Sequence, residues 1–282
     1  MTQQVWAILD SFLMQTAILF LLASGFFLIH RTANFLNIAH PDYATVGAYL
    51  IWSTASLLGW NVWIATVISM VATGFITNLI DRVSFRYLRG APLALLLCSM
   101  GVGLVVRYSA FMIWGGRFKK LTIILPNLEI GGIVVSGSLL VALAFVGLVI
   151  LLFYFILNYT RLGISIRAVA DNPSLAENFG IDTERTMKFV WFLTGCSATL
   201  GGLVLAFYQP LTYSVGFRWI LLIVAVSILA GERIKFPNLL GACVVITASM
   251  EIGLFFIPEY YRMGIGFAML IIAILVRRVL QK

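Results

Sequence analysis

The chain carries little charge and few cysteines for its length of 282 residues. Only 11% of the residues are charged, whereas 61% are hydrophobic and the mean hydropathy is +1.02. Soluble globular domains carry about a quarter charged residues, so this composition excludes a soluble domain as the main body of the chain. The three cysteines, Cys98, Cys196 and Cys243, lie in apolar segments without metal-ligand spacing, and they indicate neither a disulfide nor a metal site.

The patterns that carry covalent chemistry are also missing. The sequence has no G-x-S-x-G turn, and neither of its two histidines belongs to an H-E-x-x-H arrangement. None of the five lysines follows a glycine, which excludes the phosphate-binding loop G-x-x-x-x-G-K-[ST]. We therefore expect no enzyme and no cofactor held by this chain, and we expect any ATP hydrolysis that drives it to occur in another polypeptide.

Long apolar runs dominate the sequence instead. A run of about 18 residues or more can cross the roughly 30 Å hydrocarbon core as a helix, and in lipid such a helix satisfies its own backbone hydrogen bonds. The sequence therefore predicts an all-α, polytopic bundle that forms a single transmembrane domain over residues 1–282. We expect about eight or nine spans, at 12–30, 42–58, 61–81, 91–114, 136–157, 188–207, 216–231, 237–257 and 264–276.

The basic residues predict the orientation of these spans. If the N-terminus lies outside, nine spans leave the C-terminus inside, with thirteen Lys and Arg residues on the inner side and six on or near the outer side. This bias follows the positive-inside rule. The net charge of +8 then reports topology and attraction to anionic lipids, and nucleic acid is not an expected partner.

Residues 158–187 form the one long polar stretch, between the expected fifth and sixth spans. Asn172 and Pro173 are typical of a helix start, and Gly180 is typical of the position just after a helix end. Leu175 and Phe179 lie four residues apart and share one face of this short helix, which needs a partner surface because it would be marginal alone. Upstream, residues 162–169 have helical spacing and are interpreted as a continuation of the fifth span. An ordinary capped loop that ties down adjacent helices is the alternative.

A longer motif makes this stretch more specific. The pattern T-R-L-G-x-x-x-R-A-x-A-x-N-P-x-x-A-x-x-x-G-I at 160–181 resembles the cytoplasmic coupling loop of ATP-binding-cassette importer permeases of the branched-chain amino acid type. Residues 37–40, 99–103, 114–115 and 195–202, together with Glu251, resemble weaker patterns of the same family, so the similarity covers nearly the whole chain. Two segments depart from it: Pro41-Asp42 after His40, and the charged segment 231–237 in place of a glycine-rich, uncharged turn.

The resemblance implies an assembly of several subunits in the cytoplasmic membrane. A second permease subunit, identical or related, would enclose the translocation path with this one. Two ATP-binding-cassette subunits would grip the coupling loops, and an extracytoplasmic solute-binding protein would deliver the solute. ATP would be bound by the partner subunits. The residues that it implies for ATPase coupling are Arg167, Asp171, Asn172, Pro173, Leu175, Ala176, Phe179 and Gly180.

Candidate residues of the translocation path are polar groups at positions where an apolar side chain would cost less free energy within the membrane. Pro41 interrupts any continuous helix between the first two spans, and a broken helix at membrane depth is tolerated only where it is buried or lines a cavity. The candidates are Asn34, Asn37, His40, Asp42 and Glu251. The alternatives are a plain turn in which His40 satisfies backbone groups, and a Glu251 that binds a neighbouring hydroxyl or Arg. Arg107 lies about two turns from the outer end of its span, and we expect its side chain to extend to the membrane surface; a role in the site is the alternative.

Three functional classes fit a polytopic chain. An ATP-driven importer permease for branched-chain or other amino acids, or for a similar small polar solute, agrees best with the motif at 160–181. An ion-coupled secondary transporter or channel is the alternative, but it would place more acidic residues within spans than Glu251 alone. A membrane-embedded enzyme is disfavoured by the missing catalytic patterns.

Overall fold

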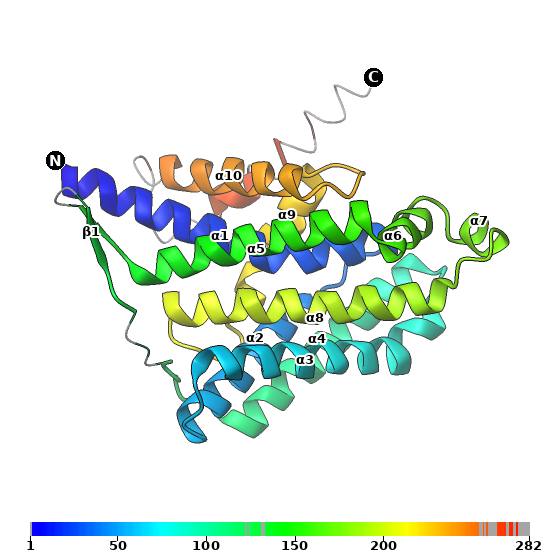
Figure 1. Cartoon of the computed structure of the whole chain (residues 1–282), viewed down its shortest axis with the longest axis horizontal. Helices are drawn as coiled ribbons and strands as arrows, with labels where there is room; N and C mark the ends of the chain where they lie inside the picture. Colours follow the sequence, from blue (N-terminus) through cyan, green and yellow to red (C-terminus); the bar gives the residue numbers. More distant parts are fainter. Residues whose placement is uncertain are drawn as a thin grey trace.

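The computed structural model describes residues 2–121, 123, 125–130, 133–253, 256, 258, 264–268, 271–272 and 275. Within this part the protein is a bundle of helices with one small hairpin (Figure 1). The helices are α1 (Thr2–Thr32), α2 (His40–Trp52), α3 (Val62–Ile80), α4 (Pro92–Trp114), α5 (Gly137–Tyr159), α6 (Arg161–Asp171), α7 (Pro173–Asn178), α8 (Thr183–Tyr208), α9 (Ile220–Leu229) and α10 (Phe236–Gly253). Short π-helical turns follow α2 (Ser53–Leu57) and α3 (Asp81–Phe85), and 3-10 turns lie at Arg86–Leu88 and Phe217–Trp219.

Six of the described helices are long and apolar enough to cross a membrane. They are Ile8–Thr32, Val62–Leu88, Pro92–Trp114, Gly137–Tyr159, Thr183–Tyr208 and Phe236–Gly253. The expected second and seventh spans correspond to the helical segments 40–57 and Phe217–Leu229, which are not among these six. The expected ninth span, 264–276, lies in part outside the described residues.

Helices α1 and α8 form the centre of the bundle, and small residues let them approach their neighbours closely. A side chain at Gly202 of α8 would collide with the carbonyl oxygen of Ala44 in α2, and one at Gly25 of α1 would collide with the hydroxyl of Ser197 in α8. Gly201 of α8 packs in the same way against Leu22 of α1. The small residues at 197–202 therefore serve helix packing, as their spacing of four predicts.

Two helices begin inside the bundle and not at its ends. The first residue of α2, His40, donates a hydrogen bond from Nε2 to the carbonyl of Leu22, in the middle of α1, at 2.8 Å. The chain also returns to this level after α8, where the backbone N–H of Gly216 donates to Oγ1 of Thr45 at 3.0 Å. The starts of α2 and of the Phe217–Leu229 helix therefore lie side by side within the bundle.

The two ends of the bundle differ. One end carries the antiparallel hairpin of β1 (Leu128–Ile130) and β2 (Ile133–Val135), close to the start of α1. The opposite end carries α6 and α7, and α7 extends beyond the ends of the long helices (Figure 1). The hairpin was not expected from the sequence.

Candidate coupling and translocation sites

A tight corner joins α5 to α6. Thr160 ends α5 and caps α6 by accepting a hydrogen bond on its side chain from the backbone N–H of Gly163 at 3.1 Å. A side chain at Gly163 would overlap the carbonyl oxygen of Ile156, so only glycine lets α6 fold back against the end of α5. Arg167 Nη1 donates to the carbonyl of Leu157 at 2.5 Å and closes the corner. The interpretation of residues 162–169 as a continuation of the fifth span was therefore wrong.

Helix α7 has the boundaries that the sequence predicts. The side chain of Asn172 accepts a hydrogen bond from the backbone N–H of Leu175 at 3.0 Å, and Pro173 is the first helical residue. Gly180 has a φ of +79°, and the N–H groups of Gly180 and Ile181 donate to the carbonyls of Glu177 and Ala176 at 2.9 and 3.0 Å. This pair of bonds is a Schellman motif, which satisfies carbonyls that the helix end leaves open.

The outer face of α7 carries two exposed apolar side chains. The side chains of Leu175 and Phe179 are 52% and 80% exposed, whereas Ala176 between them is buried against the chain's own helices. Asp171, Asn172, Pro173 and Gly180 are exposed as well. Of the predicted coupling residues, Arg167 and Ala176 therefore hold the loop to the bundle, and the others form its outer surface.

Ion pairs and a helix cap stabilise the segment where the polar stretch 158–187 leads into α8. Glu184, in the first turn of α8, pairs with Arg86 at 2.5 Å and with Lys188 at 2.7 Å. Arg86 belongs to the turn between α3 and α4, so its ion pair with Glu184 joins the start of α8 to that turn. Asp182 caps α8 by accepting from the backbone N–H of Arg185 at 2.8 Å.

The broken helix before α2 brings three of the predicted path residues together. Asn37, His40 and Asp42 have no exposed surface, and the Oδ1 atom of Asn37 accepts from the backbone N–H of Ala39 at 3.2 Å. His40 reaches the carbonyl of Leu22, as the alternative reading of that residue expects. A chain reversal within the bundle is stabilised here by buried polar groups.

Asp42 is held by an ion pair that the sequence analysis missed. Arg107 of α4 binds both carboxylate oxygens of Asp42, with Nε–Oδ1 and Nη2–Oδ2 distances of 3.0 and 2.9 Å. The two side chains are 11% and 0% exposed, and the guanidinium lies 3.5 Å from the ring centroid of Phe217. The expectation that Arg107 extends to the membrane surface was wrong, because a buried carboxylate in a low-dielectric bundle requires a partner.

One stripe of α4 fits this arrangement. Ser99, Gly103 and Arg107 follow one another at a spacing of four residues, so they share one face of the helix. The Oγ atom of Ser99 accepts from the backbone N–H of Ile38 at 3.1 Å, and Gly103 leaves room for Asp42. This spacing, together with a buried acid, Asp42, that has no partner nearby in the sequence, is the signal that could have predicted Arg107 as the partner of Asp42.

The two other path candidates lie elsewhere. Asn34 is exposed in the turn after α1, where its φ of +53° suits asparagine. Glu251 of α10 accepts hydrogen bonds from Gln15 and Ser11 of α1 at 2.9 and 3.3 Å. Since Ser11 and Gln15 precede Leu22 on α1, Glu251 lies nearer the hairpin end than His40 does. Among the described residues, no three His, Cys, Asp or Glu side chains gather in a way that would hold a metal.

Comparison with known proteins shows the family to which the chain belongs. The profile of the family described as "Branched-chain amino acid transport system / permease component" matches residues 8–274. A probable branched-chain amino acid transport permease protein LivH of Methanocaldococcus jannaschii is 30% identical over 246 residues, which cover 84% of this chain and 78% of that protein. The high-affinity branched-chain amino acid transport system permease protein LivH of Escherichia coli is 23% identical, over 91% of this chain and 88% of its own length.

A solved structure supports the fold. The chain is similar to one in "PsaBC from Streptococcus pneumoniae in complex with Fab", with a TM-score of 0.52 and 11% identity. The likeness covers 94% of this chain and 90% of that chain.

Proposed function

Since this chain belongs to the branched-chain amino acid transport permease family, whose members are multi-pass membrane permeases and not enzymes, we propose that it imports branched-chain or similar amino acids under the drive of separate ATPase subunits. The end that carries α6 and α7 faces the cytosol in this proposal, with nine spans, the N-terminus outside and the C-terminus inside. A second permease subunit completes the path, and an extracytoplasmic binding protein delivers the solute.

The outer face of α7 is the observation that carries the proposal. Leu175 and Phe179 are apolar and exposed on a helix that both caps and the α5–α6 corner hold in place. An exposed apolar pair on a rigid element at the aqueous end of a membrane bundle suits a protein partner, because burying it on association is favourable. The partner that the family implies is an ATPase subunit, which would bind α7 in a groove.

The solute path is proposed to pass beside the inner start of α2. Asn37, His40 and Asp42 lie there on a broken helix, and the start of a second helix at Phe217 lies against the same place. Such breaks within a bundle are sites where solute charges can be held. Arg107 holds Asp42 in position, so its role in the proposal is to keep this helix start in place. Asn34 and Glu251 lie apart from it and are assigned to the turn after α1 and to the α1–α10 contact.

Co-purification from native membranes tests the coupling contact. Phe179→Ala is expected to lower recovery of the ATPase subunit about thirtyfold if the ring is a central anchor of the contact. Phe118→Ala is the matched control, because Phe118 is 76% exposed but lies in the segment after α4, near the opposite end. Equal recovery with both variants, or recovery of the chain without any nucleotide-binding subunit, would contradict the proposal.

A further inference from the structure

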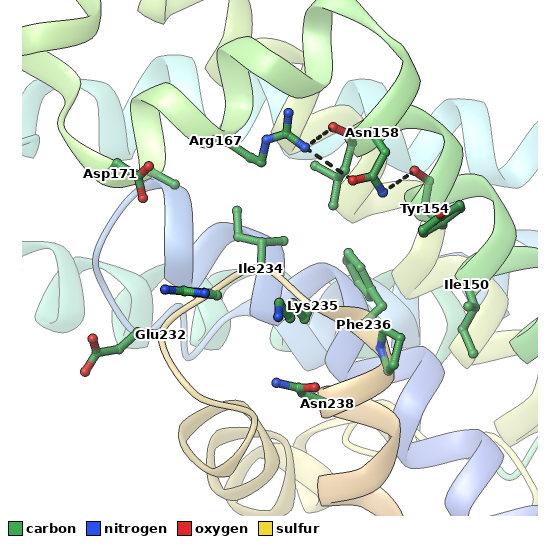
Figure 2. A pocket seen from close by; sticks show the side chains of 14 residues that line it. Ile150, Tyr154, Asn158, Arg167, Asp171, Glu232, Ile234, Lys235, Phe236 and Asn238 are labelled. Atoms are coloured by element: carbon green, nitrogen blue, oxygen red, sulfur yellow. Dashed lines mark hydrogen bonds between the residues drawn. The ribbon is translucent and has the colours of Figure 1, made fainter. Parts of the chain in front are cut away.

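A cavity of about 510 Å³ lies between the α5–α6 corner and the turn that leads into α10 (Figure 2). Its walls come from the last turns of α5, the outer side of α6 and residues 232–238. None of its lining residues belongs to α7. The cavity is therefore separate from the exposed pair Leu175 and Phe179 at the same end of the bundle, although two of the predicted coupling residues, Arg167 and Asp171, line it.

The rim of the cavity is polar and carries a positive excess. Arg167, Arg233 and Lys235 line it together with two acidic residues, Asp171 and Glu232. Figure 2 shows Arg167 and Asn158 on one side and Lys235 and Asn238 on the other, whereas the carboxylate of Glu232 is directed away from Lys235 and Asn238. Arg167 is fixed by its bond to the carbonyl of Leu157, so one basic wall is rigid. This arrangement suits an anionic group that can accept several hydrogen bonds.

The other part of the cavity is apolar and extends along α5. Ile150 lies nine residues before the end of α5 at Tyr159, which corresponds to about 13 Å along the helix axis. The part of the wall formed by Phe236 is held in place, because its ring stacks on Phe153 with a centroid distance of 4.2 Å. Beside the cavity, α5 exposes Leu151 and Phe155, as expected for a surface that faces lipid tails.

The occupant must therefore be amphipathic. A soluble anion would use only the basic rim and leave the wall formed by Ile150 and Tyr154 open. We propose that the cavity binds one anionic phospholipid of the adjacent leaflet, with its phosphate between Arg233 and Lys235 and the start of one acyl chain along Ile150 and Tyr154. Basic pockets between helices at the cytoplasmic surface recognise lipid headgroups by this combination of charge and depth.

The segment that supplies the charges is held in place by an aromatic side chain. Residues 231–237 have the sequence Gly-Glu-Arg-Ile-Lys-Phe-Pro. Phe236 anchors this turn to α5 and α1, since it also packs edge-on against Phe27 at 6.0 Å. The anchored ring holds Lys235 and Arg233 at the rim of the cavity.

Lipid retention measured by native mass spectrometry tests the proposal. The full chain, purified in detergent, is incubated with phosphatidylglycerol or with phosphatidylcholine, and the lipid that stays bound is counted. We expect selective retention of phosphatidylglycerol. Because each basic residue near a lipid surface strengthens attraction about fivefold, Arg233→Gln/Lys235→Gln is expected to weaken retention about 25-fold.

The matched control is Arg161→Gln/Arg185→Gln, which removes the same charge from exposed positions at the same end but outside the cavity. It is expected to leave retention unchanged. Equal losses from both double variants, or equal retention of the two lipids, would overturn the proposal. Soluble glycerol 3-phosphate separates a lipid site from a phosphate site: displacement of the lipid at equal concentration would assign the cavity to a free anion.

A second measurement does not depend on the folding of a variant. Phosphatidylglycerol with a photoactivatable group in its acyl chain is added to the unmodified chain and cross-linked by light. Labelling within residues 150–158 supports the proposal. Labelling spread evenly over the exposed faces of α4 and α5, with no preference for this segment, contradicts it.

Discussion

Asp42 and Arg107 illustrate how two charges are accommodated deep inside an apolar bundle. Removing both groups from water costs several kcal/mol for each ion, and the attraction between them offsets this cost only when the geometry is good. Here both carboxylate oxygens receive hydrogen bonds, and the ring of Phe217 covers the guanidinium. The pair joins α2, α4 and the start of the Phe217–Leu229 helix at one point.

Breaking this pair from one side is predicted to be costly. Asp42→Asn or Arg107→Gln leaves the other group buried without its counter-charge, and each is expected to lower the free energy of unfolding by about 3–5 kcal/mol. Thermal unfolding of the purified chain measures the loss.

The double variant Asp42→Asn/Arg107→Gln gives the control for this prediction. It removes both charges, so its loss is expected to be smaller than the sum of the two single losses. Strictly additive losses would contradict a direct interaction between the two side chains.

The sequence predicts one half of this site and misses the other for a physical reason. The interruption at Pro41 and the polar residues around it are local signals, and they pointed to a buried, broken helix. The partner of Asp42 lies 65 residues away on another helix, and only the packing of α4 against α2 brings the two together. Arg107 near the end of an apolar run resembles any arginine that extends to the membrane surface.

At the scale of elements, α7 is the part that the sequence predicts best. Its caps depend on side chains and backbone groups within ten residues, 172–181, so tertiary packing is not needed to specify them. The sequence analysis missed the break between α5 and α6, although Thr160 and Gly163 are the residues that produce it. The apolar spacing at 162–169 agrees with a continuous helix, and only the collision of a side chain at Gly163 with Ile156 reveals the corner.

The caps of α7 are predicted to control its local stability. Asn172→Ala removes the side-chain acceptor and is expected to cost about 1 kcal/mol. Gly180→Ala forces a left-handed conformation on alanine and is expected to cost about 1–2 kcal/mol. Hydrogen exchange of residues 173–181 measures both, as faster exchange confined to this segment.

Asn178→Ala is the control for these two variants, since Asn178 is an exposed residue of the same helix and is not its cap. Its exchange is expected to be unchanged. Faster exchange of the whole bundle with either cap variant would show that α7 is not an independent local unit.

The contact between α8 and α2 is predicted to tolerate no added side chain. Gly202→Ala places a methyl group against the carbonyl of Ala44, and overpacking of this kind is expected to cost about 1–3 kcal/mol. Gly101→Ala is the control, because a methyl group at this α4 position meets nothing and alanine favours the helix by up to about 1 kcal/mol. Thermal unfolding compares the two, and equal midpoints would contradict the close packing.

At the scale of the whole molecule, a continuous set of contacts joins α7 to the inner start of α2. Helix α7 leads directly into α8, and α8 packs against α1, α2 and α3. Along α8, Gly202 and Thr199 touch Ala44 and Gly47 of α2, just beyond Asp42. A tilt of α8 would therefore move the start of α2, and rigid-body motion of this kind can expose a central site to either side.

The overall architecture was predictable because long apolar runs can only be helices in lipid. Six of the expected spans are confirmed as helices long enough to cross a membrane. The helical segments at 40–57 and Phe217–Leu229 are not among them, and each begins inside the bundle. The sequence could not reveal this arrangement, because the starting level of a helix depends on its neighbours.

Uptake of leucine into proteoliposomes tests most directly whether force reaches this bundle through α7. The vesicles contain the chain with the subunits that co-purify with it, and the solute-binding protein is added on the side opposite α7. Uptake is followed with and without ATP on the side of α7. We expect uptake only with ATP. We expect Leu175→Asp/Phe179→Asp to abolish it and Phe118→Asp to leave it intact. Uptake by the chain alone along an ion gradient, without ATP, would contradict the claim that force reaches the bundle through α7. Full ATP-driven uptake by the α7 variant would contradict it as well.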